Sequence, residues 1–152
     1  MENHKRPSAT VLFIFGGSGD LNFRKLSPAL YNLFIDNWMP EKFSIIGIGR
    51  TDFSDSDYRG RLLDGIKQFS RRKDVADNQW QAFSQHVSYL KMDAEKDEKY
   101  DAISELVQKK EAEFGEHPNI IFYMAVAPQL VPDIAKNWAK KISATIKHTQ
   151  ES

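Results

Sequence analysis

The 152-residue sequence predicts an α/β fold in which helices cover both faces of a parallel sheet. Apolar segments of strand length alternate with segments of helical periodicity along the chain. The first strand, helix and second strand fit within about 40 residues, which is the size of a βαβ unit. Right-handed crossovers then give the strand order 3-2-1-4. No repeat or linker separates a further domain, so a single three-layer domain is expected.

The first strand and the first helix are predicted from residues 11 to 38. The run VLFIF at 11–15 is continuously apolar and bounded by turn residues, which is typical of a strand buried on both faces. Ser27 and Pro28 suit an N-cap and a first helical position, and the helical pattern ends near Trp38. Four apolar side chains at helical spacing define its inner face: Leu26, Leu30, Leu33 and Phe34.

The middle of the chain predicts a second strand and two helices. The segment FSIIGIG at 43–49 is the strand. The first helix is expected to begin after a cap at Ser54 or Asp55, and a shorter helix follows around Trp80 and Phe83. The inner face of the longer helix is formed by Tyr58, Leu62, Ile66 and Phe69.

The last third of the chain continues the alternation. Residues 87–93 alternate apolar and polar side chains and predict a third strand close to a sheet edge. A helix over 95–114 is expected to end at Gly115, and a fourth, strongly apolar strand spans 119–128. From Gln129 the tail is helical at first and then loses periodicity.

Composition excludes several classes of protein. Lys and Arg together number 21, as do Asp and Glu, so no nucleic-acid or acidic-membrane partner is indicated. The chain has no cysteine, hence no disulfide and no thiolate metal site, and no metal is predicted. The polar residues 1–10 precede only five apolar residues, too few for a signal peptide or a membrane span. A cytoplasmic protein is expected, and each of His4, His86, His117 and His148 is expected at the surface.

A glycine cluster follows the first strand. Glycines permit positive φ and a close approach of the backbone to a ligand, and a helix N-terminus directs free N–H groups at an anion. Gly16, Gly17 and Gly19 supply the glycines and Ser18 a hydroxyl, while Asn22 stands where a dinucleotide fingerprint has its third glycine. Taken alone, the cluster fits either a phosphate cradle or a tight turn.

Charged residues around this cluster have more than one reading. Asp20 is interpreted as a helix cap or a partner of loop backbone rather than a general base. Arg24 and Lys25 fit either a phosphate or solvent. Arg50 and Thr51, at the end of the second strand, fit recognition of the 2′-phosphate of NADP, although Arg50 could also be a plain surface residue. Together with the glycines they favour NADP in a Rossmann-like doubly wound fold.

Three motifs in order resemble the N-terminal coenzyme domain of the glucose-6-phosphate dehydrogenase family. They are Gly16-Gly17-Ser18-Gly19-Asp20-Leu21 followed by Arg24-Lys25 and Pro28, then Gly47-Ile48-Gly49-Arg50, then Phe122-Tyr123-Met124-Ala125-Val126-Ala127-Pro128. The likeness spans residues 11 to about 138. Asn22 and Phe23 depart from the family pattern, so contacts by their side chains to a cofactor are in doubt.

The resemblance implies an NADP-dependent oxidation of glucose 6-phosphate to its lactone, a step of the pentose phosphate pathway. It implies that Lys25 lies near an active site and that the full-length protein is a homo-oligomer with a sugar-phosphate substrate. It assigns cofactor contacts to Gly16, Gly17, Ser18, Gly19, Asp20, Leu21, Arg50 and Thr51.

Family members are about three times longer than this chain. The family's E-K-P-F-G and H-Y-x-G-K segments are absent, so no catalytic residue is placed on these 152 residues. Two hypotheses follow: the coenzyme domain of a dehydrogenase, or a free-standing, non-catalytic NADP-binding module. For either, a flexible 1–10, an NADP-binding domain at 11–138 and a truncated tail at 139–152 are expected, with weak NADP binding and no turnover.

Overall fold

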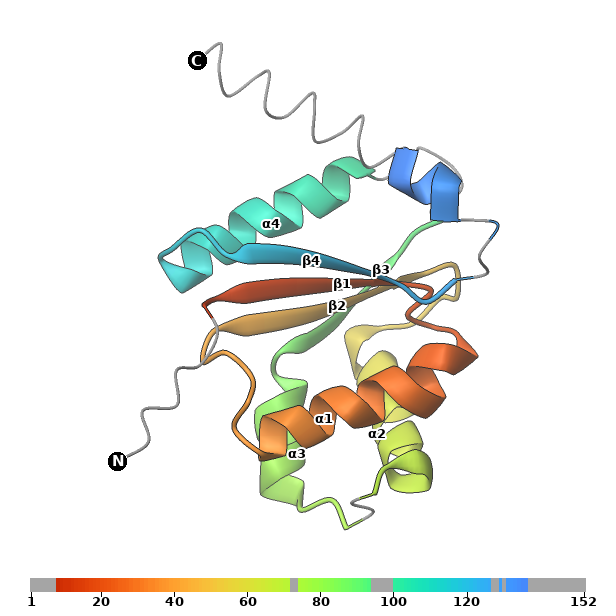
Figure 1. Ribbon diagram of the computed structural model, residues 1–152, viewed down its shortest axis with the longest axis vertical. Helices are drawn as coiled ribbons and strands as arrows, with labels where there is room; N and C mark the ends of the chain where they lie inside the picture. The colour runs from red at the N-terminus through yellow and green to blue at the C-terminus, as the bar shows by residue number, and fades with distance from the viewer. Residues whose placement is uncertain (1–7, 72–73, 94–99, 127–128, 130, 137–152) are drawn as a thin grey trace.

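The computed structural model describes residues 8–71, 74–93, 100–126, 129 and 131–136. Within them the chain forms a four-stranded, fully parallel sheet of order β3-β2-β1-β4 (Figure 1), which confirms the predicted topology. The strands are β1 (Thr10–Phe15), β2 (Phe43–Gly49), β3 (Val87–Lys91) and β4 (Asn119–Met124).

Helices cover both faces of this sheet, as Figure 1 shows. Four helical elements lie on one face: the π-helical turn η1 (Asn22–Leu26), α1 (Ser27–Ile35), α2 (Asp55–Phe69) and α3 (Asp77–Ser84). The helix α4 (Tyr100–Phe114) covers the other face, and residues 131–136 are helical on that same side. The described residues therefore form the three predicted layers.

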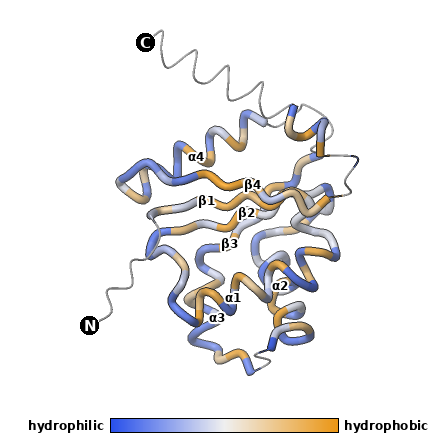
Figure 2. The backbone as a smooth tube through the Cα atoms, in the orientation of Figure 1, coloured by the Kyte–Doolittle hydropathy of each residue, from blue (hydrophilic) through white to orange (hydrophobic). Residues whose placement is uncertain are grey.

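Successive residues of β1 point to opposite layers, since side chains alternate along a strand. Ile14 joins the cluster under α1, α2 and α3, whereas Val11, Phe13 and Phe15 join the cluster under α4. Ile134, from the helical residues 131–136, is buried in the α4 cluster as well. In Figure 2 much of the apolar colour lies on the strands, and it recurs at intervals along the helices. Burial on both faces explains why the run at 11–15 is continuously apolar.

The first helix begins earlier than the sequence predicts. Residues 20–26 are already helical, and the Ser27 N–H donates to Asn22 O, five residues back. Ser27 is thus inside the helix, and the N-cap prediction is wrong: its hydroxyl bonds to the Asn22 side chain instead of capping a free N–H. The helix ends at Ile35, before Trp38, because Asn37 adopts a left-handed φ of 63°.

The second half of the fold follows the prediction closely, with differences at the ends of elements. Ser54 rather than Asp55 caps α2, since its Oγ accepts a hydrogen bond of 3.0 Å from the Asp57 N–H. Phe69 was predicted on the inner face of α2, but it is 39% exposed and packs edge-on against Phe23. The expected end of α4 is confirmed at Gly115, which has a φ of 70°.

The strand β4 lies at a sheet edge and is shorter than predicted, ending at Met124. Its even-numbered side chains Ile120, Phe122 and Met124 pack against the α4 cluster. On its opposite face Ile121 is 50% exposed and Tyr123 is 40% exposed. The strand is strongly apolar, as predicted, and yet one of its faces is open.

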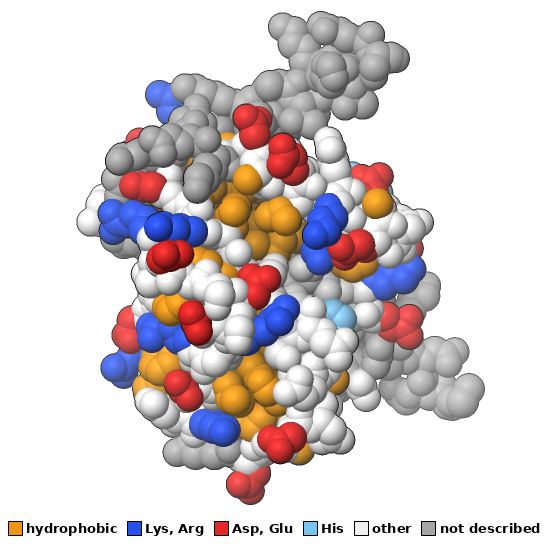
Figure 3. Space-filling model, turned by 180° about the vertical axis from the view of Figure 1, so that it is seen from behind, with side chains coloured by type: hydrophobic (Ala, Val, Ile, Leu, Met, Phe, Trp, Pro, Cys, Tyr) orange, Lys and Arg blue, Asp and Glu red, His pale blue; other side chains and the backbone are white. Residues whose placement is uncertain are grey.

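Charge is distributed evenly over the surface that Figure 3 presents. Acidic and basic side chains are interspersed there, and apolar side chains reach the surface in small groups between them. This face carries no broad basic area of the kind that binds a polyanion. None of the helices among the described residues is long and apolar enough to cross a membrane.

His86, predicted at the surface, is only partly exposed. Its ring stacks on Phe43 with the centroids 3.9 Å apart, and its Nδ1 lies 2.9 Å from Phe43 O, close enough for Nδ1–H to donate. Burial lowers the pKa of His86, and nearby Lys110 lowers it further. His117 is exposed, as predicted, while His4 and His148 lie outside the described residues.

This environment predicts a pH dependence of stability. A lowered pKa in the folded state means that protonation favours the unfolded chain, so the stability due to neutral His86 is lost as pH falls below about 6.5. His86→Gln, which cannot titrate, is expected to flatten the change in urea midpoint between about pH 8 and about pH 5.5. The exposed His117→Gln should leave that change intact. An equal change in urea midpoint for all three proteins would contradict the attribution of this pH dependence to His86.

Candidate functional site

The glycine cluster lies at the carboxyl end of β1, where the strand order reverses between β1 and β4. Gly16 has a φ of 79°, and both the Gly16 and Gly17 N–H groups donate to Ile48 O at 2.9 Å. The Ala125 N–H donates to Phe15 O at 2.8 Å, so the segment after β4 lies against the turn. A Cβ on Gly16 would overlap the backbone of Ala125. In open α/β sheets this crevice is where ligands bind.

A buried hydrogen-bond network holds the turn from beneath. Asn22 is 0% exposed, and its Nδ2 donates to Gly17 O at 2.7 Å and to the Tyr58 hydroxyl at 2.9 Å. Tyr58 in turn donates to Gly17 O at 3.1 Å, and the Ser27 hydroxyl donates to Asn22 Oδ1 at 2.8 Å. Burial raises the pKa of Tyr58, which keeps its hydroxyl protonated as a donor.

The sequence did not assign this network to the site. Asn22 was noted only as a departure from the glycine fingerprint, and Tyr58 only as a helix core residue. The only signal in the sequence was that Asn22, at the position of the third glycine, stands five residues before Ser27. Asn22 and Ser27 are brought together by the helical turn between them, and Tyr58 comes from α2.

Glycines in the turn, in β2 and in α2 make room for the network. A Cβ on Gly47 would overlap the Tyr58 ring, and one on Gly17 would come within 2.9 Å of the Tyr58 hydroxyl. Gly65 lets α2 approach η1, because a Cβ there would overlap Phe23 O. In the usual fingerprint the third glycine permits close packing of the first helix. Here Gly65 of α2 permits close packing of α2 against η1.

The end of β2 brings the other predicted residues beside the turn. A Cβ on Gly49 would overlap the Ser18 hydroxyl, which hydrogen bonds to Tyr89. The Tyr89 hydroxyl donates to Thr51 O at 2.7 Å, and burial raises the pKa of Tyr89. Arg50, directly after β2, is exposed. Sequence reasoning missed Tyr89, which joins the turn to the 50–51 segment.

Of the residues that follow the turn, Asp20 and Arg24 bind each other, whereas Lys25 and Leu21 are exposed. Arg24 Nε lies 2.9 Å from both carboxylate oxygens of Asp20, and its guanidinium lies 5.1 Å from the centre of the Phe69 ring. The interaction of Asp20 is thus with a side chain four residues on, rather than the predicted cap or backbone bond. Lys25 is exposed, and so is Leu21.

This arrangement suits an anion bound at the turn. The first N–H groups of a helix have no partner within it, and they carry the positive end of its dipole. Within the part of the chain that the structure describes, a Cβ on Gly19 would come close only to Gly16 O, at 3.2 Å, so Gly19 is little enclosed there. Among the described residues no group of three His, Asp or Glu side chains is placed to hold a metal ion.

Comparison with known proteins agrees with this geometry. The family model described as "Glucose-6-phosphate dehydrogenase, NAD binding domain" matches residues 13–151. The chain belongs to the glucose-6-phosphate dehydrogenase family. The match covers the family's nucleotide-binding domain, which confirms the resemblance inferred from the three motifs.

Comparison with individual members of this family shows what part of their length this chain covers. Glucose-6-phosphate 1-dehydrogenase of Leuconostoc mesenteroides is 35% identical over 127 residues, which are 84% of this chain and 25% of the relative. The Bacillus subtilis enzyme is 31% identical over 136 residues, 90% of this chain and 26% of the relative. The chain thus spans about a quarter of the length of these relatives.

A solved structure of the family has the same fold. It is described as glucose-6-phosphate dehydrogenase in complex with its substrate glucose 6-phosphate, and it superposes with a TM-score of 0.77 at 30% identity. The superposition covers 90% of this chain and 28% of that one. A second, from Mycobacterium avium, has a TM-score of 0.74 at 25% identity.

Proposed function

We propose that this chain is the NADP-binding domain of a glucose-6-phosphate 1-dehydrogenase. The observation that carries the proposal is the cradle formed by Gly16, Gly17 and Gly19 at the carboxyl end of β1, with Arg50 beside it at the end of β2. The N–H groups of the first helical turn, which have no partner within the helix, suit the pyrophosphate, and a guanidinium suits the 2′-phosphate that distinguishes NADP from NAD.

Each remaining residue of the proposed site has a definite part. Ser18 and Thr51 are proposed to offer hydroxyl groups between the turn and Arg50, and Asp20 and Leu21 to begin the helix whose free N–H groups meet the cofactor phosphates. Lys25 is proposed to point toward the sugar-phosphate side, as the family resemblance implies. When bound, NADP supplies the hydride acceptor, and these residues hold and orient it.

The complete reaction is proposed for the longer protein of the family, acting in the cytoplasm as a homo-oligomer in the pentose phosphate pathway. Oxidation of an alcohol needs a base to take the hydroxyl proton as hydride leaves. His86, which stacks on Phe43 at the end of β2 opposite the turn, and the exposed His117 are poorly placed for that role. The half-exposed Ile121 and Tyr123 on β4 support further polypeptide packing there.

Calorimetric titration of the 152-residue chain with NADP and with NAD tests the cofactor assignment. NADP is expected to bind more tightly than NAD, and Arg50→Asp to weaken NADP binding by roughly 10- to 100-fold because a charged phosphate contact is lost. Lys109→Asp makes the same charge change on α4, which covers the other face of the sheet, and should leave both affinities unchanged.

Equal affinities for the two cofactors in the unmodified chain would refute the role of Arg50. The same preparation supplied with glucose 6-phosphate and NADP is expected to form no NADPH above a control without protein. Formation of NADPH by these 152 residues would refute the proposal that the catalytic groups lie in the part of the longer family proteins that this chain does not cover.

A further inference from the structure

The outer edge of β3 has backbone groups that no strand of the described sheet can reach. The Ile45 N–H donates to His86 O at 2.7 Å, and the Met92 N–H donates to Gly49 O at 2.8 Å. In a parallel ladder, alternate residues direct their N–H and C=O toward one neighbour. The residues of opposite parity, Val87, Tyr89 and Lys91, therefore direct theirs away from β2.

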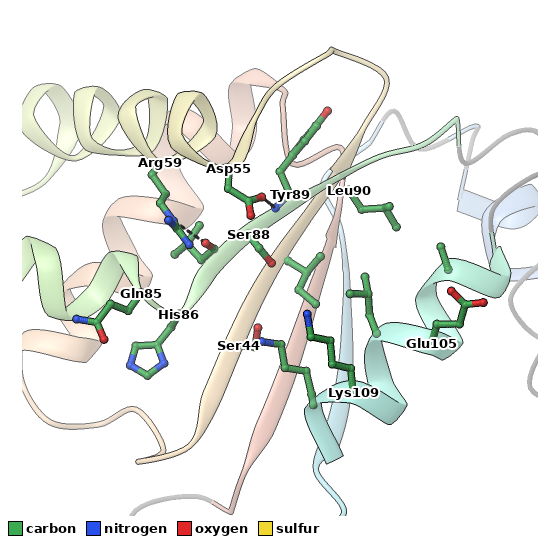
Figure 4. Close-up of a pocket in the computed structure, with 15 residues that line it drawn as sticks. Ser44, Asp55, Arg59, Gln85, His86, Ser88, Tyr89, Leu90, Glu105 and Lys109 are labelled. Carbon is green, nitrogen blue, oxygen red and sulfur yellow. Dashed lines mark hydrogen bonds between the residues drawn. The ribbon is translucent and has the colours of Figure 1, made fainter. Parts of the chain in front are cut away.

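Two side chains of α2 meet these outward groups. The Tyr89 N–H donates to Asp55 Oδ1 at 2.9 Å, and Arg59 Nε donates to Val87 O at 2.8 Å. Asp55 and Arg59 are four residues apart and so lie on one side of the helix. Figure 4 shows both reaching from α2 to β3, with the dashed lines marking hydrogen bonds.

Together the two side chains occupy the place of one residue of a neighbouring strand. A parallel partner of β3 would donate one N–H to Val87 O and accept the Tyr89 N–H with the C=O of the same residue. Arg59 Nε takes the part of that N–H, and Asp55 Oδ1 takes the part of that C=O. An added strand would have to displace both.

No further strand of the described residues pairs with the outer edge of β3. A groove of about 490 Å³ runs between β3 and α4, and Ser44, Ser88 and Lys109 are among the residues that line it. None of its lining residues belongs to the glycine turn at 16–21. Exposed edge strands readily pair with copies of themselves when nothing blocks their hydrogen bonds.

We propose that Asp55 and Arg59 form an edge clamp that prevents β3 from pairing with a second copy of this chain. The same two side chains supply hydrogen-bond partners for the outward Val87 C=O and Tyr89 N–H, so these backbone groups stay paired in the monomer. Lys91 is exposed on the same edge and adds a charged side chain that opposes pairing.

Sedimentation of the 152-residue chain over a range of concentrations tests the clamp. Asp55→Ala with Arg59→Ala is expected to raise the weight-average mass, relative to the unmodified chain, toward a twofold increase. Asp57→Ala with Arg61→Ala removes the same charges from the same helix at the same spacing, while Arg61 lies over the Phe23 ring rather than at β3. This control should sediment as the unmodified chain does.

A third substitution tests whether the association involves β3. The Lys91 N–H points away from β2, so Lys91→Pro removes an outward donor without breaking the ladder. Added to the Asp55→Ala/Arg59→Ala variant, it should restore the sedimentation of the unmodified chain. Association that persists after Lys91→Pro would overturn the proposal.

Unchanged sedimentation of a folded Asp55→Ala/Arg59→Ala variant would overturn it too. If that variant loses its helical circular dichroism, Arg59→Ala alone, which keeps the Asp55 bond to Tyr89, replaces it in the same assay. The single variant is expected to associate, and its sedimenting as the unmodified chain does would count equally against the clamp.

Discussion

Gly16→Ala is expected to destabilise the chain by at least about 3 kcal/mol, a large part of the total stability of an ordinary domain. Two independent penalties add at this position. A φ of 79° costs a residue with a side chain about 1 to 2 kcal/mol. The new Cβ would also overlap the backbone of Ala125, which cannot move without disturbing its bond to Phe15 O.

Two other glycines separate these penalties. Gly115 has a φ of 70° but open space around it, so Gly115→Ala should cost only about 1 to 2 kcal/mol. Gly60 lies inside α2 with open space and no positive φ, and Gly60→Ala should stabilise the chain by about 0.5 to 1 kcal/mol.

Urea denaturation followed by far-UV circular dichroism measures all three variants. The expected order of stability is Gly60→Ala, the unmodified chain, Gly115→Ala, then Gly16→Ala. If Gly16→Ala were no less stable than Gly115→Ala, the close contact between the turn and Ala125 would be disproved.

Asn22→Ala is expected to cost about 2 to 4 kcal/mol, because it leaves buried polar groups without a partner and opens a small cavity. The Ser27 hydroxyl loses its acceptor, and Gly17 O keeps only the longer bond from Tyr58. Asn32→Ala is the matched control on α1: the Asn32 amide oxygen accepts one bond of 3.2 Å from Ser70, at a partly buried position. It should cost about 1 kcal/mol or less.

A double-mutant cycle identifies the network as the cause. Asn22 and Tyr58 are in direct contact, so Asn22→Ala and Tyr58→Phe should show a coupling energy of about 0.5 to 3 kcal/mol, measured from urea midpoints. Additive effects of the two substitutions, or a cost for Asn22→Ala equal to that for Asn32→Ala, would contradict the role of the network.

The sequence predicted the topology well because the signals for it are local. The continuous apolar runs at 11–15 and 43–49 are dictated by burial on both faces, and the structure places β1 and β2 side by side at the centre of the sheet. The edge position of β3 was likewise visible in its alternating pattern.

Three features differ from what the local sequence patterns predict. Ser27-Pro28 has the local pattern of a helix start, but the Asn22–Ser27 bond belongs to a helix that begins earlier. Phe69 has the spacing of a core residue, yet it packs on Phe23 at the surface. Strand β4 has the composition of a buried strand and one open face.

The candidate site divides in the same way. The position of the glycines and Arg50 at one end of the sheet could be predicted from the sequence, because parallel strands direct their carboxyl ends to the same edge. The contacts of Tyr58 and Tyr89 with the turn could not be predicted, because these residues come from α2 and β3, far from the turn in the sequence. The cofactor contacts of the eight residues assigned to the site remain a prediction.

The support beneath Gly17 also bears on the thermodynamics of ligand binding. Gly17 O accepts hydrogen bonds from the Asn22 and Tyr58 side chains of the chain itself, so the conformational entropy of the turn is lost during folding. A preorganised turn of this kind leaves little ordering cost for the binding step, and more of the contact energy is realised as affinity. Substitutions beneath the turn could therefore weaken binding while every atom that touches the ligand stays the same.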